Sequence, residues 1–215
     1  MSRRAMFGLG SLLVLLVAAG FTAFRPKQAD DPKKDESLIA QRTKGSATAL
    51  LTIYEMSDFQ CPYCARFALE IFPTLDAEYI QTGKVRWIFV NFPLPMHPNA
   101  TPAAEVAMCA AKQGKFWPVH DLLFRNQKTW APLTAPAEYF LTFADSASLN
   151  RTAFQECLST DATLAEVKSD AEAAVRSGAK STPSFYIEGG IMAGAQPLTV
   201  FRPILDSVYA TKTAK

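Results

Sequence analysis

The sequence has few of the residues that bind metal ions: it contains two histidines and four cysteines among its 215 residues. A structural zinc site takes four ligands, usually from a second CxxC pair or a histidine pair. Cys109 and Cys157 stand alone, and His97 and His120 do not have the spacing of a ligand pair. These absences disfavour a zinc site, and we expect no metal and no other cofactor.

The sequence also lacks a large excess of charge of either sign and any internal repeat. Lysine and arginine total 22, aspartate and glutamate total 20, and the net charge is +2. Residues 1–26 hold three of the arginines, which leaves 19 basic and 20 acidic residues and a charge near −1 on the rest. Without a basic stripe, we expect no nucleic acid partner. The length and the 49% hydrophobic content fit one domain with an elaboration.

The N-terminal 24 residues contain a long stretch without charge. Two arginines precede Ala5–Phe24, which has no charged residue, and its most apolar run is Leu12–Ala19. The short run is typical of a signal peptide, whereas the whole stretch has roughly the 20 residues of a membrane helix. Both interpretations place the following domain outside the cytoplasm. Whether residues 1–24 are a cleaved signal peptide or a membrane anchor stays open.

Residues 25–46 are charged and poor in aromatic side chains, which predicts a polar linker before a domain at 47–215. Within this domain, the pattern predicts a strand at 49–56, a helix at 62–83 that Pro73 kinks and Gly83 ends, and a strand at 84–92. A helical block follows at about 98–178. Two strands around a Gly-Gly turn and a helix from Pro197 complete the chain. The order β–α–β, helical block, β–β–α predicts an α/β architecture.

The stretch "DFQCPYCARF" places two cysteines at the predicted start of the first helix. Cys61 would stand just before the helix, where the exposed amides and the helix dipole favour a thiolate. Cys64 would lie one turn later and close a small ring with Cys61. A disulfide around so small a loop constrains the unfolded chain little, so a purely structural role is disfavoured. Pro62 at the first helical position costs no hydrogen bond. The pattern therefore favours electron exchange, with Cys61 reacting first and Cys64 resolving.

Other residues support redox chemistry. Pro183 follows Thr182 at the start of a strand and suggests a cis peptide bond packed on the dithiol, although a trans proline that opens a strand is the commoner case. Glu55 falls on the same strand face as Ile53, so it is either a buried acid near the dithiol or a strand-end acid that reaches solvent. Tyr63 lies between the cysteines and is expected to tune their reduction potential.

The chain resembles the DsbA family of thiol:disulfide oxidoreductases. The resemblance is carried by the dithiol stretch and by "FPLPMHPNA", "AMCAAKQGKFWPVHDLLF", "FQECL" and "TPSFYIEGG". The resemblance implies a thioredoxin-like fold with a helical insertion between its β-α-β and β-β-α halves. It also implies that the dithiol is Cys61 and Cys64, that the cis-proline is Pro183 after Thr182, and that the buried acid is Glu55. The Pro-Tyr dipeptide departs from the Pro-His of the strongly oxidising members, which leaves the direction of electron flow open.

Proteins of this branch carry a cysteine at the positions of both Cys109 and Cys157. In an exported protein two leftover cysteines tend to pair, which favours a structural disulfide. Two free, buried cysteines are the alternative.

The resemblance implies an exported enzyme, located in the periplasm or on the extracytoplasmic face of the membrane, that introduces disulfides into reduced or unfolded exported proteins. A membrane redox partner would reoxidise it, and a monomer is expected. Phe59, Tyr63 and the "PLPM" loop would form an apolar rim for the client. The alternatives are an isomerase or reductase kept reduced by a membrane donor, an exported chaperone or binding module, and a zinc or copper carrier.

Overall fold

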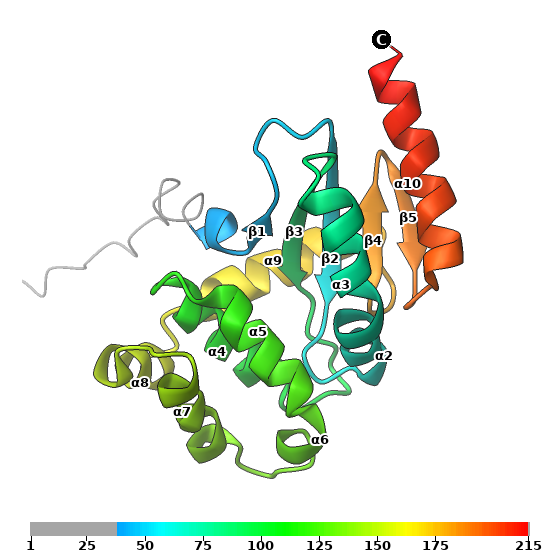
Figure 1. Ribbon diagram of the computed structural model, residues 1–215. Helices are drawn as coiled ribbons and strands as arrows, with labels where there is room; N and C mark the ends of the chain where they lie inside the picture. Colours follow the sequence, from blue (N-terminus) through cyan, green and yellow to red (C-terminus); the bar gives the residue numbers. More distant parts are fainter. Residues whose placement is uncertain (1–37, 215) are drawn as a thin grey trace, which may run out of the picture. The chain divides into compact units, whose positions relative to one another are not determined.

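The computed structural model describes residues 38–214 (Figure 1). The predicted signal peptide or anchor at 1–24, and the linker up to residue 37, lie outside the described residues. Within the described part, no helix combines the length and apolar character needed to cross a membrane.

A mixed five-stranded sheet forms the centre of the fold, in the order β1-β3-β2-β4-β5. The two longest strands, β2 and β3, are parallel, while β4 runs antiparallel to β2 and the short β1 antiparallel to β3. β5 pairs antiparallel with β4 at the edge. The strand bounds are β1 Thr43–Lys44, β2 Leu51–Ser57, β3 Val85–Asn91, β4 Ser184–Ile187 and β5 Gly190–Ala193. All four predicted strands are confirmed.

One face of the sheet is covered by the helical segment after β2 and by the C-terminal helix α10 (Leu198–Thr213). Strand alternation points Ile53 and Phe185 into this core. The rings of Phe67 and Phe201, from the two helical segments, lie 4.6 and 5.0 Å from the ring of Phe185. This aromatic cluster fixes the helix that carries the dithiol against the sheet.

The first helical segment confirms the predicted irregularity around Pro73. It runs through α2 (Pro62–Arg66), the π-helical η1 (Phe67–Ile71), α3 (Phe72–Leu75) and the π-helical η2 (Asp76–Ile80). Next to Pro73, which has no N–H to donate, the amide of Phe72 bonds the carbonyl of Phe67 five residues back. The segment ends as predicted at Gly83, whose φ of +76° is readily adopted by glycine.

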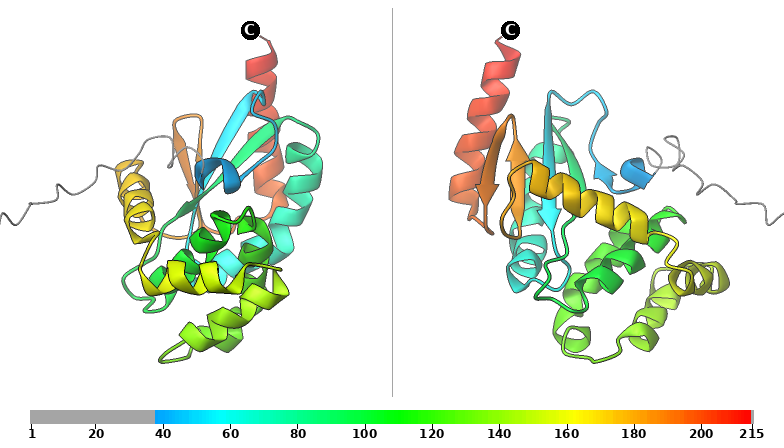
Figure 2. Two further views of the ribbon diagram at one scale, coloured as in Figure 1. Left: turned by 90° about the vertical axis from the view of Figure 1, so that its left-hand side faces the viewer. Right: turned by 180° about the vertical axis from the view of Figure 1, so that it is seen from behind.

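The helical block between β3 and β4 is confirmed. It comprises α4 Ala100–Ala111, α5 Phe116–Arg125, α6 Gln127–Trp130, α7 Ala137–Ser146, α8 Arg151–Ser159 and α9 Leu164–Arg176. A disulfide between Cys109 of α4 and Cys157 of α8 crosses this block, with a sequence separation of 48 residues. The last helix of this block, α9, lies across the second face of the sheet (Figure 2). There Ala174 packs in one cluster with Met56.

The N-terminal boundary of the folded domain lies earlier than predicted. Leu38 and Arg42 are each only 3% exposed, and Thr43 and Lys44 form β1 against β3. The end of the predicted linker at residue 46 is therefore wrong, because residues 38–44 belong to the fold. The Arg42 guanidinium pairs with both carboxylate oxygens of Asp170 in α9, one of them at 2.9 Å, and Asp170 also accepts from the side chain of Asn91. The partner of this charge lies 128 residues away, beyond the reach of a local sequence pattern.

Removing this buried ion pair should destabilise the whole domain. Arg42→Ala leaves the Asp170 carboxylate without its countercharge, so we expect the free energy of unfolding of the full chain to fall by about 3–5 kcal/mol. Chemical denaturation with tryptophan fluorescence measures it. Arg151→Ala, which removes the exposed pair with Asp145, is the matched control and should cost less than about 1 kcal/mol. Equal losses in the two variants would contradict a structural role for Arg42.

Candidate active site

The two cysteines lie where β2 turns into α2, as the sequence predicted. Cys61 precedes the helix and Pro62 occupies its first turn. Both sulfurs are free thiols in this structure, with Cys61 4% exposed and Cys64 fully buried. The Cys61 thiol donates to the carbonyl of Thr182 at 3.4 Å, and the peptide bond between Thr182 and Pro183 is cis. The structure thus brings together the predicted residues from opposite ends of the domain.

The surroundings of the two thiols differ in their effect on acidity. The hydrogen bond from Cys64 lowers the pKa of Cys61 to about 6, against the opposing effect of burial and with further help from the Thr182 side chain and the amides of Cys64 and Tyr63. The Thr182 hydroxyl has no other partner among the described residues. Burial, and then the charge of Cys61, raise the pKa of Cys64 well above its ordinary value. Near neutral pH, Cys61 is a thiolate and Cys64 keeps its proton.

Glu55 is 1% exposed, so of the two alternatives that its strand position left open it is the buried acid that the resemblance implied. Its Oε2 accepts a hydrogen bond of 2.9 Å from the Trp87 indole, and its Oε1 has no partner in the described part of the chain. Burial raises the pKa of Glu55 to about 7. The hydroxyl of Ser57, two residues along the same strand face, lowers the pKa of both Glu55 and Cys64 without a well-formed hydrogen bond to either. Ser57 is therefore near both the carboxyl group and the buried thiol.

Sequence reasoning missed the residues that hold the dithiol loop. The Gln127 side chain of α6 donates to the carbonyls of Phe59 and Cys61 at 2.7 and 2.9 Å. The buried Asp58 carboxylate accepts from His97 Nδ1 at 2.7 Å. His97 stands in the loop between β3 and α4, and its contact with the dithiol loop was not foreseen. Nothing in the local sequence around Gln127 or Asp58 distinguishes them from ordinary polar residues, since their partners are far along the chain.

The predicted apolar rim is only partly correct. Tyr63 and Met96 are 58% and 77% exposed beside the dithiol loop. The guanidinium of Arg66 lies 5.5 Å from the Tyr63 ring centre. Phe59, in contrast, is 1% exposed and stacks on Phe89 at 5.0 Å, so its assignment to the rim is wrong. The turn after β2 directs Phe59 into the core of the helical insertion.

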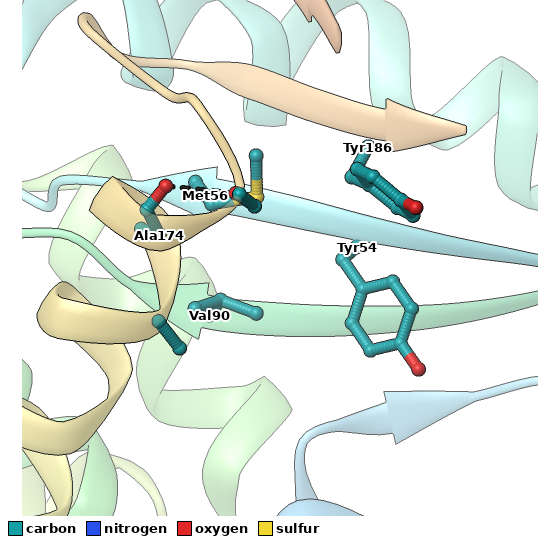
Figure 3. A pocket seen from close by; sticks show the side chains of 7 residues that line it. Tyr54, Met56, Val90, Ala174 and Tyr186 are labelled. Atoms are coloured by element: carbon teal, nitrogen blue, oxygen red, sulfur yellow. Dashed lines mark hydrogen bonds between the residues drawn. The ribbon is translucent and has the colours of Figure 1, made fainter. Parts of the chain in front are cut away.

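Other parts of the domain do not add to this site. His120 is buried among aromatic rings of the insertion, and burial lowers its pKa. Within residues 38–214, no three histidine, cysteine or acidic side chains gather to hold a metal ion. A pocket of about 220 Å³ opens on the second face of the sheet, where Tyr54, Met56 and Tyr186 face α9 (Figure 3). Neither Cys61 nor Cys64 lines it.

Comparison with known proteins agrees with this geometry. A family profile described as Thioredoxin matches residues 37–207, most of the chain. The chain belongs to the thioredoxin family. Among solved structures, this thioredoxin-family fold is similar to BdbD from Bacillus subtilis, with a TM-score of 0.72 and 22% identity over 79% of this chain and 93% of that one. The alpha-DsbA1 of Wolbachia pipientis gives a TM-score of 0.72 and 23% identity, over 80% and 92% of the two chains. The predicted DsbA-type fold is confirmed.

Curated relatives of this thioredoxin-family chain carry two kinds of name. It is 30% identical over 182 residues to Na(+)/H(+) antiporter NhaA 3 of Salinispora tropica, which covers 84% of this chain and 26% of that protein. It is 27% identical to the probable disulfide bond formation protein D of Bacillus anthracis, over 70% and 71% of the two chains. The chain spans about a quarter to a third of the length of the antiporter relatives it matches first. Ion transport is therefore not carried over from their names.

The acidity of Cys61 is directly measurable. In the reduced full chain, we expect the ultraviolet absorbance of the thiolate to titrate with a midpoint near the pKa of about 6. Because this value lies below the ordinary 9.0, the thiolate stabilises the reduced fold over the unfolded chain increasingly from pH 6 to pH 9, and this stabilisation is lost as the pH falls through 6. Cys64→Ala removes the strongest hydrogen bond to the thiolate and should raise the midpoint. A midpoint near 9 in the unmodified protein would contradict this description.

The raised pKa of Glu55 predicts a stability change with a defined pH dependence. Ionisation of Glu55 costs stability as the pH rises from 4.5 through about 7, because the fold disfavours the charged form. Glu55→Gln, which cannot ionise and still accepts from Trp87, should therefore raise the free energy of unfolding by up to about 3 kcal/mol above pH 8. Below pH 4.5 the difference should vanish. Glu138→Gln, on the exposed face of α7, is the control and should show no such trend.

Proposed function

We propose that this thioredoxin-family protein is a thiol:disulfide oxidoreductase that introduces disulfides into exported proteins through Cys61 and Cys64. The observation that carries the proposal is the asymmetry of the two thiols. The pKa of Cys61 is lowered to about 6, while that of the buried Cys64 is raised well above its ordinary value. A low-pKa thiolate at a helix start is the usual attacking and leaving sulfur of such enzymes. The names of the disulfide bond formation proteins agree with it.

The reaction starts from the oxidised pair. A client thiolate attacks Sγ of Cys61, the Cys61–Cys64 bond breaks, and the electron pair of that bond leaves on Cys64. A second client thiolate then attacks the client sulfur of the mixed disulfide, and Cys61 departs as a thiolate. The client loses two electrons and gains a disulfide, while the protein takes up the two electrons as a dithiol. The low pKa of Cys61 makes it the better leaving group in the second step.

Glu55 supplies the proton that Cys64 needs. When the first step leaves the electron pair on Cys64, the buried sulfur must be protonated, because burial disfavours its charge. Glu55, whose pKa is about 7, holds a transferable proton near neutral pH. The Ser57 hydroxyl, which lowers the pKa of both groups, bridges the transfer. On reoxidation the proton returns along the same path.

The Thr182 backbone, just before cis-Pro183, binds the client. The Thr182 backbone faces Cys61, and its carbonyl already accepts from the thiol at 3.4 Å. An extended client segment that pairs with this backbone brings its own sulfur next to Cys61. The exposed side chains of Tyr63 and Met96 offer apolar contact beside it. Pro62 shapes the helix start, and Tyr63 contributes to the potential of the pair.

Location and partners follow from the N-terminal sequence and the family. The uncharged stretch Ala5–Phe24 exports the domain to the periplasm or to the extracytoplasmic face of the membrane, as a signal peptide or as an anchor. Reduced or unfolded exported proteins are the clients. A membrane redox partner accepts electrons from the Cys61–Cys64 dithiol, which needs no other cofactor, and the protein works as a monomer.

The direction of electron flow separates this proposal from an isomerase or reductase. A protein-disulfide isomerase of Novosphingobium aromaticivorans has a similar fold, with a TM-score of 0.65 and 23% identity, so likeness of fold does not choose between them. The stabilised Cys61 thiolate favours the reduced form and hence an oxidising disulfide. A reduction potential clearly less negative than about −270 mV, the value of thioredoxin, supports the oxidase; an equal or more negative value favours the reductase.

Single substitutions in the dithiol should separate its two roles. With a reduced, unfolded client that needs disulfides to fold, Cys61→Ser should abolish oxidation, because no sulfur remains to form the mixed disulfide. Cys64→Ser cannot form the reactive disulfide and should not oxidise the reduced client; with a client that already carries a disulfide, its Cys61 thiolate should displace one client sulfur and form a mixed disulfide, visible on non-reducing gels, that no Cys64 thiol can resolve. The double variant Cys109→Ser with Cys157→Ser, which removes only the other disulfide, should keep the activity. Full client oxidation by Cys61→Ser would overturn the mechanism. No client oxidation by the unmodified protein, together with an ordinary Cys61 pKa, would favour a chaperone or binding module.

A further inference from the structure

The buried carboxylate of Asp58 is an unusually well connected group beside the dithiol. Its side chain is 0% exposed. Oδ1 accepts from the amide of Gln60 at 2.7 Å, and Oδ2 accepts from the amide of Leu94 at 2.8 Å and from Nδ1 of His97 at 2.7 Å. Two of these three donors come from the loop between β3 and α4. A buried carboxylate is stable only if such donors replace its hydration. The hydrogen bonds therefore hold both the carboxylate and the loop between β3 and α4 in place.

The backbone of the same residue is bonded to both cysteines. The amide of Asp58 donates to the Cys64 sulfur at 3.4 Å, and its carbonyl accepts from the amide of Cys61 at 3.1 Å. A movement of Asp58 therefore changes the hydrogen bonds at both ends of the dithiol. Of the three donors to the Asp58 carboxylate, only the one from His97 is a side chain, and it is thus the one that a substitution can remove.

His97 reaches this buried group from the surface. Its side chain is 19% exposed, and the preceding Met96 is 77% exposed in the same loop. The proposed reaction leaves His97 without a part, because it does not contact either sulfur. The structure contains no other side-chain contact from this loop to the Asp58 carboxylate among the described residues. Among the described residues, the His97 imidazole is the one side chain of this loop that bonds the Asp58 carboxylate.

We propose that His97 is a positioning residue for the dithiol, which acts by holding the Asp58 carboxylate through its Nδ1 donor. Without this donor, the Asp58 carboxylate retains only its two amide partners and can shift, and with it the Asp58 backbone that is bonded to both cysteines. A shift of the Asp58 amide away from Cys64 weakens the hydrogen bonds that end on Cys61, which disfavours the thiolate there. The inference rests on the proposed function only in taking Cys61 as the attacking sulfur.

Two amide substitutions that differ by one methylene test the proposal. In His97→Asn, the side-chain amide nitrogen stands close to the position of Nδ1 and can donate to Asp58. In His97→Gln, the longer side chain carries its amide past that position. The readout is the acid dissociation constant of the Cys61 thiol in the reduced full chain, followed by the ultraviolet absorbance of the thiolate. Thermal unfolding of each variant is recorded beside it.

We expect His97→Gln and His97→Ala to lower the Cys61 dissociation constant by about threefold or more, the scale of one weakened hydrogen bond. In His97→Asn the Cys61 dissociation constant should stay within about twofold of its value in the unmodified protein. In Met96→Ala, a change in the same loop, it should equal the unmodified value. If His97→Gln and His97→Ala lose thermal stability but leave the dissociation constant unchanged, His97 is merely structural and the proposal is wrong. If His97→Ala does not fold, the comparison of Asn with Gln still decides. Because no client is used, failure of the oxidase proposal would not affect this result.

Discussion

Burial of the dithiol at the junction of β2 and α2 imposes a condition that the rest of the domain has to meet. Cys64 is fully buried and Cys61 nearly so, and burial alone would raise the pKa of both thiols. A thiolate can exist there only if donors are directed at one sulfur. The Cys64 thiol, the Thr182 side chain and the amides of the helix start supply them to Cys61. The acidity of Cys61 is thus a property of the assembled fold and not of the CxxC motif alone.

The need for these donors explains why segments far apart in the sequence contact the short loop that carries Cys61. Thr182 comes from the segment before β4, 121 residues after Cys61. Gln127 comes from the helical insertion and holds the carbonyls of the loop, which keeps the amides of the loop aimed at the sulfurs. The insertion is in turn fixed by the Cys109–Cys157 disulfide and, through α9, by the buried pair of Asp170 with Arg42. Packing far from the dithiol therefore contributes to its chemistry.

The sequence was sufficient where a local pattern carries the information. Alternation along 49–56 placed Glu55 on the buried face, and Pro62 with the CxxC spacing placed the cysteines at a helix start. It was insufficient where a polar residue is defined by a remote partner, as for Arg42, Asp58 and Gln127. Phe59 was assigned to the surface because it adjoins the cysteines in sequence. Its burial depends on Phe89 and the insertion, which no short-range pattern reveals.

Two buried carboxyl groups near the dithiol differ in how many donors they meet, and this difference separates their tasks. Asp58 meets three N–H donors, which commit both of its oxygens to fixed partners. Glu55 meets one indole N–H, and its second oxygen has no partner among the described residues. Fixed donors on both oxygens hold the Asp58 carboxylate in place, whereas the Glu55 carboxyl group, with an open oxygen and a pKa of about 7, can take up either form. The two acids, three residues apart at the end of one strand, therefore have different roles: Asp58 holds the dithiol loop in place, and Glu55 is suited to proton transfer.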